Sequence, residues 1–409
     1  MSVTNSAMPE QSPSADLYWD PLDKGLRVDP HPVWKRLRDE APVYYNERYD
    51  FFTLSRFEDV DAAHRDPGLF SSAHGTVLEM MTNNLVSTEG MMIFLDPPDH
   101  TRLRRLVSKA FTPRRISELE GSVRQLCARL LDERRDDPSW DYVEQFGAIV
   151  PAVVIASLLG VPEADREEVR KTIDGMFHQE PDVGMANDQA MMAGARLHEY
   201  IGGQLAERRT NPQDDMLTDL VQAEIVDDSG VARQLTEAES ANFAILLVGA
   251  GTETVARLIG WAGLLLASHP DQRAEMVADP SLIPGAIEEL LRYESPSPVQ
   301  GRWTTASSEL HGQVIPADAK VLLLTGSAGR DERTFPDADR FDIHRLMARH
   351  VSFGYGIHLC IGAALARLEA RIAIEETLKR YPTWEVDTER AVLLFTSTVR
   401  GFSRLPISP

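Results

Sequence analysis

A single cysteine near the C-terminus stands among residues that would make it a metal ligand. Cys360 lies in the segment Phe353-Gly354-Tyr355-Gly356-Ile357-His358-Leu359-Cys360-Ile361-Gly362, before a helix predicted from about residue 361 to residue 380. Two glycines before the cysteine allow a tight turn and the close approach of a flat ligand. Unpaired N–H groups at the start of the helix point back at the sulfur, so we expect a lowered thiol pKa. The resulting thiolate is a strong ligand for a soft metal, and on haem iron it favours O–O cleavage.

An inert buried thiol is the alternative for Cys360, and the residues around it decide between the two. The segment resembles the haem-binding loop of the cytochrome P450 superfamily, Phe-x-x-Gly-x-x-x-Cys-x-Gly, without a departure. The resemblance implies that Cys360 is the axial ligand of the iron of haem b. It also places four neighbours at the cofactor: Phe353, Gly354, His358 and Gly362.

A second candidate site lies in the middle of a helix predicted from about Thr236 to His269. It reads Gly249-Ala250-Gly251-Thr252-Glu253-Thr254, and each glycine inside a helix costs about 1 kcal/mol relative to alanine. Close packing of another helix would explain the glycines, and so would room for a ligand. The stretch resembles the P450 oxygen-activation motif, Ala/Gly-Gly-x-Asp/Glu-Thr. The resemblance implies that Thr254 holds the distal hydrogen bond, Glu253 relays protons, and Ala250 and Gly251 face the haem.

Basic side chains at separate points of the sequence form the third motif. His100 and Arg104 lie four residues apart and therefore on one helical face. Together they could bind a carboxylate; the alternative is that both are solvent-exposed surface residues. The pair is similar to the P450 His-x-x-x-Arg, whose members bind haem propionates. Arg302 and His358 match two further propionate-binding positions of the family.

Glu289 and Arg292 place opposite charges three residues apart on one helical face. A solvated pair of this kind is worth about 0.2–0.5 kcal/mol. The spacing also resembles the P450 Glu-x-x-Arg, which pairs with an arginine of a later meander, and Arg340 matches that partner. The resemblance implies a buried charge network of Glu289, Arg292 and Arg340 that supports the cysteine loop.

Composition excludes several classes of protein. The 63 acidic and 42 basic residues give a net charge of −21, which is opposite to that of a nucleic-acid binder. Two cysteines exclude a disulfide framework, and Cys127 is expected to be an inert core or half-buried thiol. One basic run stands out, and we expect it to dock an acidic ferredoxin-type redox partner through Arg102, Arg105, Lys109, Arg114 and Arg115.

The patterns predict a mainly helical fold with a minor β lobe at about residues 40–70 and 300–330. Residues 1–15 are expected to be a disordered tail and 16–409 a single domain. The resemblance implies the P450 fold, a triangular helical prism with haem between a long central helix and the cysteine-loop helix. The N-terminus has no signal-peptide pattern. The apolar stretch 241–268 contains Glu253 and Arg257, so we expect a buried helix and a cytoplasmic monomer without a membrane anchor.

The leading hypothesis is a bacterial-type haem-thiolate monooxygenase that inserts one atom of O₂ into a small apolar substrate. Its electrons would come from a separate ferredoxin and ferredoxin reductase. The alternatives are a haem-thiolate enzyme with peroxide-driven or oxidative-coupling chemistry and a non-catalytic haem sensor. A Cys–His hydrolase built on Cys360 and His358 is disfavoured because the two residues flank a helix start and no oxyanion partner is evident.

Overall fold

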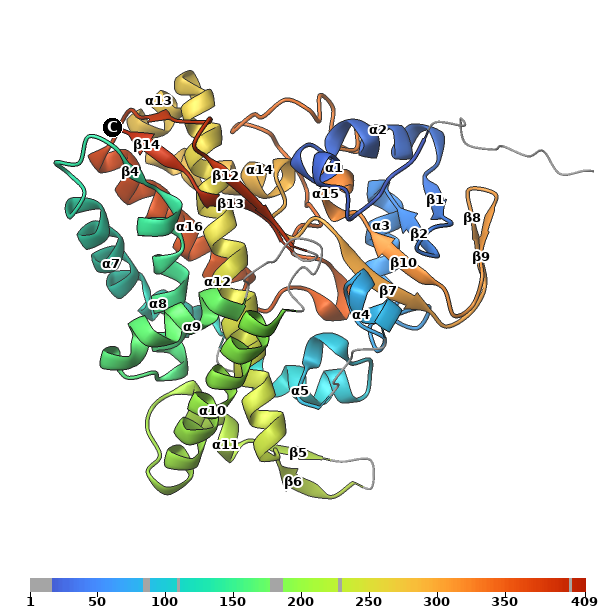
Figure 1. Cartoon of the computed structure of the whole chain (residues 1–409), viewed down its shortest axis with the longest axis horizontal. Helices are drawn as coiled ribbons and strands as arrows, with labels where there is room; N and C mark the ends of the chain where they lie inside the picture. Colours follow the sequence, from blue (N-terminus) through green and yellow to red (C-terminus); the bar gives the residue numbers. More distant parts are fainter. Residues whose placement is uncertain (1–16, 84–88, 109–110, 177–186, 227–229, 397–398) are drawn as a thin grey trace, which may run out of the picture.

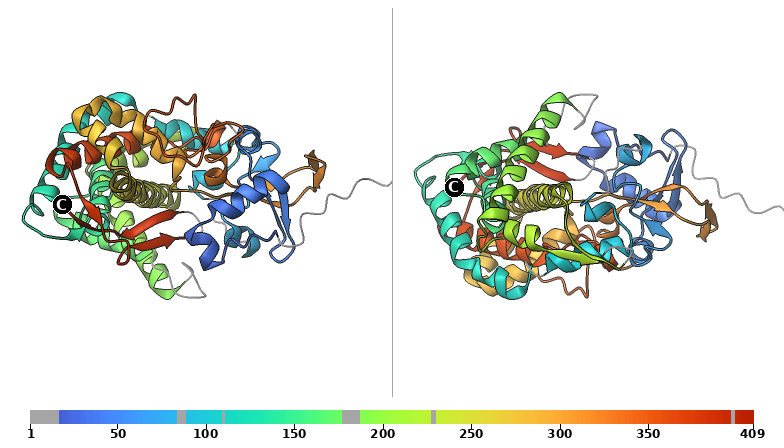
Figure 2. Two further views of the ribbon diagram at one scale, coloured as in Figure 1. Left: turned by 90° about the horizontal axis from the view of Figure 1, so that it is seen from above. Right: turned by 90° about the horizontal axis from the view of Figure 1, so that it is seen from below.

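Helix α12, Glu237–Ser268, is the element around which the other helices are arranged. Thr236 caps it, and the predicted capping box is confirmed because Thr236 and Glu239 bond each other's backbone N–H groups. The computed structural model describes residues 17–83, 89–108, 111–176, 187–226, 230–396 and 399–409. The helix runs through the middle of the molecule in Figure 1 and is seen end-on in both views of Figure 2. It is long and apolar enough to span a bilayer, but 67% of its most apolar window is buried inside the protein, as predicted for a core helix.

Most of the chain is helical, which confirms the predicted fold class. Helices α7, α8, α14 and α16 share with α12 one apolar core, to which α12 contributes Leu258 and Ile259 and α8 contributes Val150. In chain order, the other α-helices are α1 Lys24–Val28, α2 His31–Glu40, α3 Phe57–Arg65, α4 Leu78–Asn83, α5 Asp99–Ser108, α6 Pro113–Glu118, α7 Glu120–Asp132, α8 Ile149–Leu159, α9 Arg166–Met176, α10 Asp188–Thr210, α11 Met216–Gln222, α13 Pro270–Ala278, α14 Ile283–Tyr293, α15 Thr325–Ala328 and α16 Ala363–Arg380.

A five-stranded sheet brings together two segments that are far apart in the sequence. Its strands follow the order β1-β2-β10-β7-β3, with β2 and β10 parallel and the other neighbours antiparallel. Phe52 pairs with Val321 and Leu54 with Leu323, and these side chains enter one apolar cluster. Figure 1 shows the sheet on the side of α12 opposite α7 and α8. The bounds are β1 Val43–Asn46, β2 Phe51–Leu54, β3 Phe70–Ser71, β7 Gln300–Thr304 and β10 Lys320–Leu323.

The smaller sheets hold the C-terminal segment against the helices. Strand β14 lies between β11 and β4, and β13 pairs with β12 and contacts α12. The sequence patterns missed β4, β13 and β14, because strands of two to five residues carry too few positions for an alternation signal. The remaining strands are β4 Trp140–Asp141, β5 Glu224–Val226, β6 Ala232–Gln234, β8 Ser308–Leu310, β9 Gln313–Ile315, β11 Glu385–Val386, β12 Val392–Phe395, β13 Arg400–Arg404 and β14 Pro406–Ser408.

Two stretches of the chain differ in local structure from the predicted patterns. The helix predicted over 142–159 begins with a π-helical turn, Val143–Gly147, before α8. The stretch 71–96, predicted to be irregular, contains α4 and a 3₁₀ turn, Met92–Phe94. The second irregular region predicted, 178–186, lies outside the described residues.

Candidate active site

The loop before Cys360 adopts the tight backbone turn predicted from its two glycines. Gly354 and Gly356 both have φ of 66°, in the left-handed region that favours glycine. A Cβ atom on Gly356 would lie 2.3 Å from the carbonyl oxygen of His64, so α3 and the loop approach each other closely only with glycine there. The N–H of Cys360 donates to the carbonyl of Phe353 at 2.9 Å, which closes the loop.

The sulfur of Cys360 has the environment of a ligand rather than that of a solvent-exposed thiol. Its side chain is accessible, and desolvation by the protein atoms around the sulfur raises the pKa of the Cys360 thiol. The N–H of Gly362 and the guanidinium groups of Arg104 and Arg367 act in the opposite direction but do not offset burial. The predicted net lowering of this pKa is therefore wrong. A bond to a metal is what would hold the thiolate here.

Phe353, predicted to lie at the cofactor, is half-buried beside the loop, and Arg367 of α16 lies over its ring at 4.6 Å from the centroid. Arg367 also donates to both carboxylate oxygens of Glu288, at 2.6 and 2.8 Å. His350 contacts the same carboxylate at 3.0 Å. Side chains from α14 and α16 thus fix the ring that precedes the cysteine.

The four side chains predicted to bind propionates come together in the fold. His100 is 2% exposed, and its ring lies 4.4 Å from that of His358 between centroids. Burial, Arg302, His100 and Arg104 lower the pKa of His358 to about 2. Arg104 donates to the carbonyl of Leu359 at 2.5 Å, which ties α5 to the cysteine loop. The predicted cluster is therefore assembled from α5, β7 and the loop itself.

This cluster fits a group that carries carboxylates. Among the described residues, neither ring nitrogen of His100 nor Nε2 of His358 has a hydrogen-bond partner. Arg302 is 5% exposed and donates to the carbonyl of its neighbour Gly301 at 2.7 Å. The nearby acid is Asp96, which accepts from Ser71 Oγ at 2.5 Å and acts on His100 and Arg302. Buried donors without acceptors are costly, and the two propionates of a haem would supply the acceptors.

The middle of α12 leaves two small side chains uncovered. Ala250 is exposed and Thr254 is half-buried, although the helix is mainly buried. The hydroxyl of Thr254 donates to the carbonyl of Ala250 at 3.0 Å. A Cβ atom on Gly251 would lie 3.4 Å from Ile155 of α8, so this glycine lies against a neighbouring helix. Helix packing, the alternative that the two glycines left open, thus accounts for Gly251, and its contact with haem stays a prediction.

Glu253 has a partner that the sequence patterns did not single out. Nε of Arg257, one turn further along α12, donates to Oε2 of Glu253 at 3.1 Å, and Nη2 donates to the same oxygen. The arginine also donates to the carbonyl of Phe402 in β13. A Cβ atom on Gly401 would lie 2.6 Å from Arg257 Cβ, so only glycine lets β13 pass so close to α12. The predicted proton-relaying acid is therefore held in a buried ion pair.

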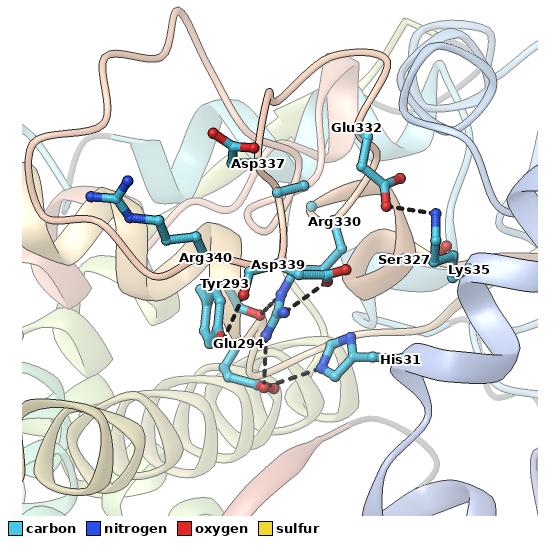
Figure 3. Close-up of polar contacts among 12 residues, drawn as sticks. His31, Lys35, Tyr293, Glu294, Ser327, Arg330, Glu332, Asp337, Asp339 and Arg340 are labelled. Atoms are coloured by element: carbon cyan, nitrogen blue, oxygen red, sulfur yellow. Dashed lines mark hydrogen bonds and ion pairs between the residues drawn. The ribbon is translucent and has the colours of Figure 1, made fainter. Parts of the chain in front are cut away.

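The charge network predicted around Glu289 exists, but one of its members is wrong. Arg292 donates to Glu289 through Nε at 2.6 Å and through Nη2 at 2.7 Å, and both side chains are fully buried. The third arginine is Arg345, whose Nε lies 3.2 Å from Glu289. Arg340 is 69% exposed, pairs with Asp342 at 3.6 Å, and points outward in Figure 3. Arg340 contributes only its carbonyl oxygen, which accepts from Arg292 and Arg345.

A second buried carboxylate, Glu294, was missed by the sequence patterns. It accepts from His31 of α2 at 3.1 Å, from Arg330 at 3.2 Å, and from Arg400 of β13 (Figure 3 shows the first two contacts). Burial by itself raises the pKa of Glu294. The nearby Arg400, His31 and Arg330 lower it by more than burial raises it, so the net result is a pKa of about 2. No local spacing links these four residues, so only the fold reveals the cluster.

The basic run is only partly available for docking. Arg105 is exposed, whereas Arg102 lies 2.6 Å from Asp99, Arg114 lies 3.2 Å from Glu118 and Arg115 lies 2.9 Å from Asp219. Lys109 lies outside the described residues. Arg102 and Arg105 belong to α5, the helix that Arg104 ties to the cysteine loop.

The other cysteine, Cys127, is inert, as predicted. It is fully buried, and burial raises the pKa of its thiol to about 12. Within the described part of the chain, no group of three or more His, Cys, Asp or Glu side chains is placed to hold a metal ion.

Comparison with known proteins gives a single family. The cytochrome P450 family model matches residues 43–408. The chain is 40% identical over 395 residues to the putative cytochrome P450 123 of Mycobacterium tuberculosis, covering 96% of this chain and 97% of the relative. It is 36% identical to the vitamin D(3) 25-hydroxylase of Pseudonocardia autotrophica, covering 100% and 98% of the two chains. The solved structure of a P450 EryK mutant with erythromycin B has a TM-score of 0.83 at 34% identity, covering 93% of this chain and 96% of that one.

The chain therefore belongs to the cytochrome P450 family, and it is a bacterial-type haem-thiolate monooxygenase with haem b as its cofactor. The hydroxylase HmtN of himastatin biosynthesis has the same fold, with a TM-score of 0.82 at 35% identity over 93% of this chain and 97% of that one.

Proposed function

We propose that Cys360 is the axial ligand of the haem iron and that the enzyme hydroxylates a small apolar molecule. The observation that carries the ligand assignment is the accessible sulfur beside the Gly362 N–H, two residues after His358, whose ring contacts the unpartnered imidazole of His100. Haem with a thiolate ligand supplies the oxygen chemistry when it is bound. His100, Arg104, Arg302 and His358 would hold its propionates.

The two cysteines provide a matched test of this assignment. In the reduced protein exposed to carbon monoxide, Cys360→Ser is expected to abolish the thiolate-type Soret band and the monooxygenase activity. Cys127→Ser removes the other buried thiol and is expected to keep both. A Cys360→Ser protein that retained the thiolate-type band would refute the assignment.

Proton delivery is assigned to two residues of α12. The hydroxyl of Thr254 is half-buried and can turn from the Ala250 carbonyl toward a ligand, which is how it would hold the distal hydrogen bond. Glu253, the next acid, would pass protons to it once the contact with Arg257 loosens. Ala250 and Gly251 leave room beside the cofactor.

The substrate is assigned to the apolar class from the residues that line one cavity. This cavity has a volume of about 70 Å³. Three segments that are distant in the sequence contribute to it, through Val77 and Leu78, Pro298 and Val299, and Thr396. The N-terminal segment adds Trp19, Leu26 and Trp34. Two relatives are named for an organic molecule that they act on or bind: one is a vitamin D(3) 25-hydroxylase, and the other was solved with erythromycin B.

Electrons are assigned to a separate ferredoxin-type protein, and the enzyme to the cytoplasm as a monomer. Exposed Arg105 and the partly paired Arg102, Arg114 and Arg115 lie along α5 and α6, and α5 is tied to the cysteine loop through Arg104. Such a basic strip is complementary to an acidic carrier. Steady-state turnover should therefore weaken as ionic strength rises, through KM for the carrier rather than through kcat.

A further inference from the structure

One buried imidazole near the cysteine loop has no role in the assignments above. His64 belongs to α3, and its side chain is 3% exposed. Within the described residues neither of its ring nitrogens has a hydrogen-bond partner. A neutral imidazole has one N–H donor and one acceptor nitrogen, and leaving such a group buried and unpaired destabilises the fold. The position therefore requires a polar partner.

The surroundings of His64 identify the place where that partner must lie. A Cβ atom on Gly354 would be 3.7 Å from its Cε1 and 3.9 Å from its Nδ1, so the ring lies against the first turn of the cysteine loop. Burial and then the positive charge of Arg302 lower the pKa of His64 to about 3, and His64 in turn acts on His358. The ring is thus part of the basic cluster formed by α5, β7 and the loop.

The charge balance of this cluster favours a carboxylate as the missing partner. It contains two arginines, Arg104 and Arg302, and the imidazoles of His64, His100 and His358. The acid that acts on it is Asp96, whose oxygens already accept from Ser71 Oγ and Ser72 N–H. An additional anion would accept the free imidazole N–H groups and offset the two guanidinium charges.

We propose that His64 is a third imidazole that binds a haem propionate, next to His100 and His358. The inference rests on the proposed function, because it requires haem to be ligated by Cys360. It adds α3 to the elements that hold the cofactor, so one helix of the sheet-bearing side is locked to the cysteine loop through the propionate and through the close contact at Gly356.

The test edits the residue and the cofactor independently. His64→Phe keeps a flat ring but removes both nitrogens, and His64→Gln keeps a donor. Haem loss from each ferric holoprotein to apomyoglobin is measured for protein loaded with haem and for protein loaded with haem dimethyl ester, whose propionates cannot accept as carboxylates. His269→Gln is the control. His269 is half-buried at the C-terminal end of α12 and contacts the Leu265 carbonyl, so it takes no part in the basic cluster.

With natural haem, His64→Phe is expected to lose the cofactor at least about tenfold faster than the wild type, the equivalent of one charge-assisted hydrogen bond. His64→Gln should recover most of this difference, and the carbon monoxide band should not move. With the dimethyl ester, the variants and the wild type should lose the cofactor at one rate. A His64→Phe effect that persists with the ester would assign His64 to packing and overturn the proposal, as would the absence of any effect with natural haem. A wild type that loads haem without the thiolate band would instead refute the Cys360 assignment.

Discussion

Two of the buried carboxylate–guanidinium pairs each join residues one turn apart on a single helix, and they differ in how fully the carboxylate is bonded. On α14, Glu289 is completely buried and accepts from Arg292 through two nitrogens, from Arg345 and from the N–H of Asp342. On α12, the contacts of Glu253 with Arg257 both fall on one oxygen, Oε2. Arg257 itself divides its donors between this carboxylate and the carbonyl of Phe402.

The difference shows how a protein separates support from chemistry with the same residue types. A carboxylate whose two oxygens accept from several fixed donors cannot gain a proton or change partner without a large loss of free energy. A carboxylate bonded through one oxygen can exchange that contact for a water or a hydroxyl. We infer that Glu289 holds the meander beneath the cysteine loop, and that Glu253 is the acid able to move a proton.

The largest effect is expected for the fully bonded pair. Glu289→Ala leaves Arg292 buried without its counter-charge, which should lower the free energy of unfolding by about 3–5 kcal/mol. Urea or thermal unfolding of the haem-loaded protein measures this.

Arg340→Ala is the matched control, because Arg340 was the arginine that the sequence predicted for the network. Its side chain is exposed, so the change should stay within about 0.5 kcal/mol. If Arg340→Ala lowered the free energy of unfolding as much as Glu289→Ala does, Arg340 would be the partner of Glu289, as the sequence predicted. The assignment of Arg345 to the network would then be wrong.

Glu253→Gln should lower kcat about 100-fold, because the amide keeps an acceptor for Arg257 but cannot carry a proton. The kinetic solvent isotope effect should increase at the same time. The same substitution at the other pair, Glu289→Gln, should reduce stability while leaving kcat per bound haem unchanged. If both variants lost kcat equally, the distinction between the two carboxylates would fail.

The third prediction concerns acid stability and the cluster around Glu294. Its pKa in the folded protein is about 2, below the value for an unfolded chain, so it stabilises the fold above about pH 5. That contribution, on the order of 3 kcal/mol, is lost as the pH falls from about 5 toward 2. Glu294→Gln should therefore reduce stability at pH 7 and flatten its decline between pH 5 and 3, as followed by unfolding at each pH. A decline as steep as that of the wild type would assign the acid sensitivity to other carboxylates.

Sequence reasoning succeeded where one short segment carries the whole signal. The left-handed glycines before Cys360 and the capping box at Thr236 depend on neighbours within a few residues, and both are confirmed. It failed where distant segments compete for one partner. Arg340 and Arg345 lie five residues apart in the same meander, and nothing in the spacing indicates which guanidinium turns inward.

The sequence by itself determined the family and the mainly helical fold, and it singled out Cys360 as the candidate ligand, because these depend on motifs whose order and local spacing are readable along the chain. Only the tertiary structure decided the electrostatics. The direction of the Cys360 pKa, the pairing of Glu253 with Arg257, the Glu294 cluster and the position of His64 all depend on burial and on groups brought together from distant segments. Desolvation and charge act through space, so the distance between two groups in the fold, rather than their separation in the sequence, sets their effect.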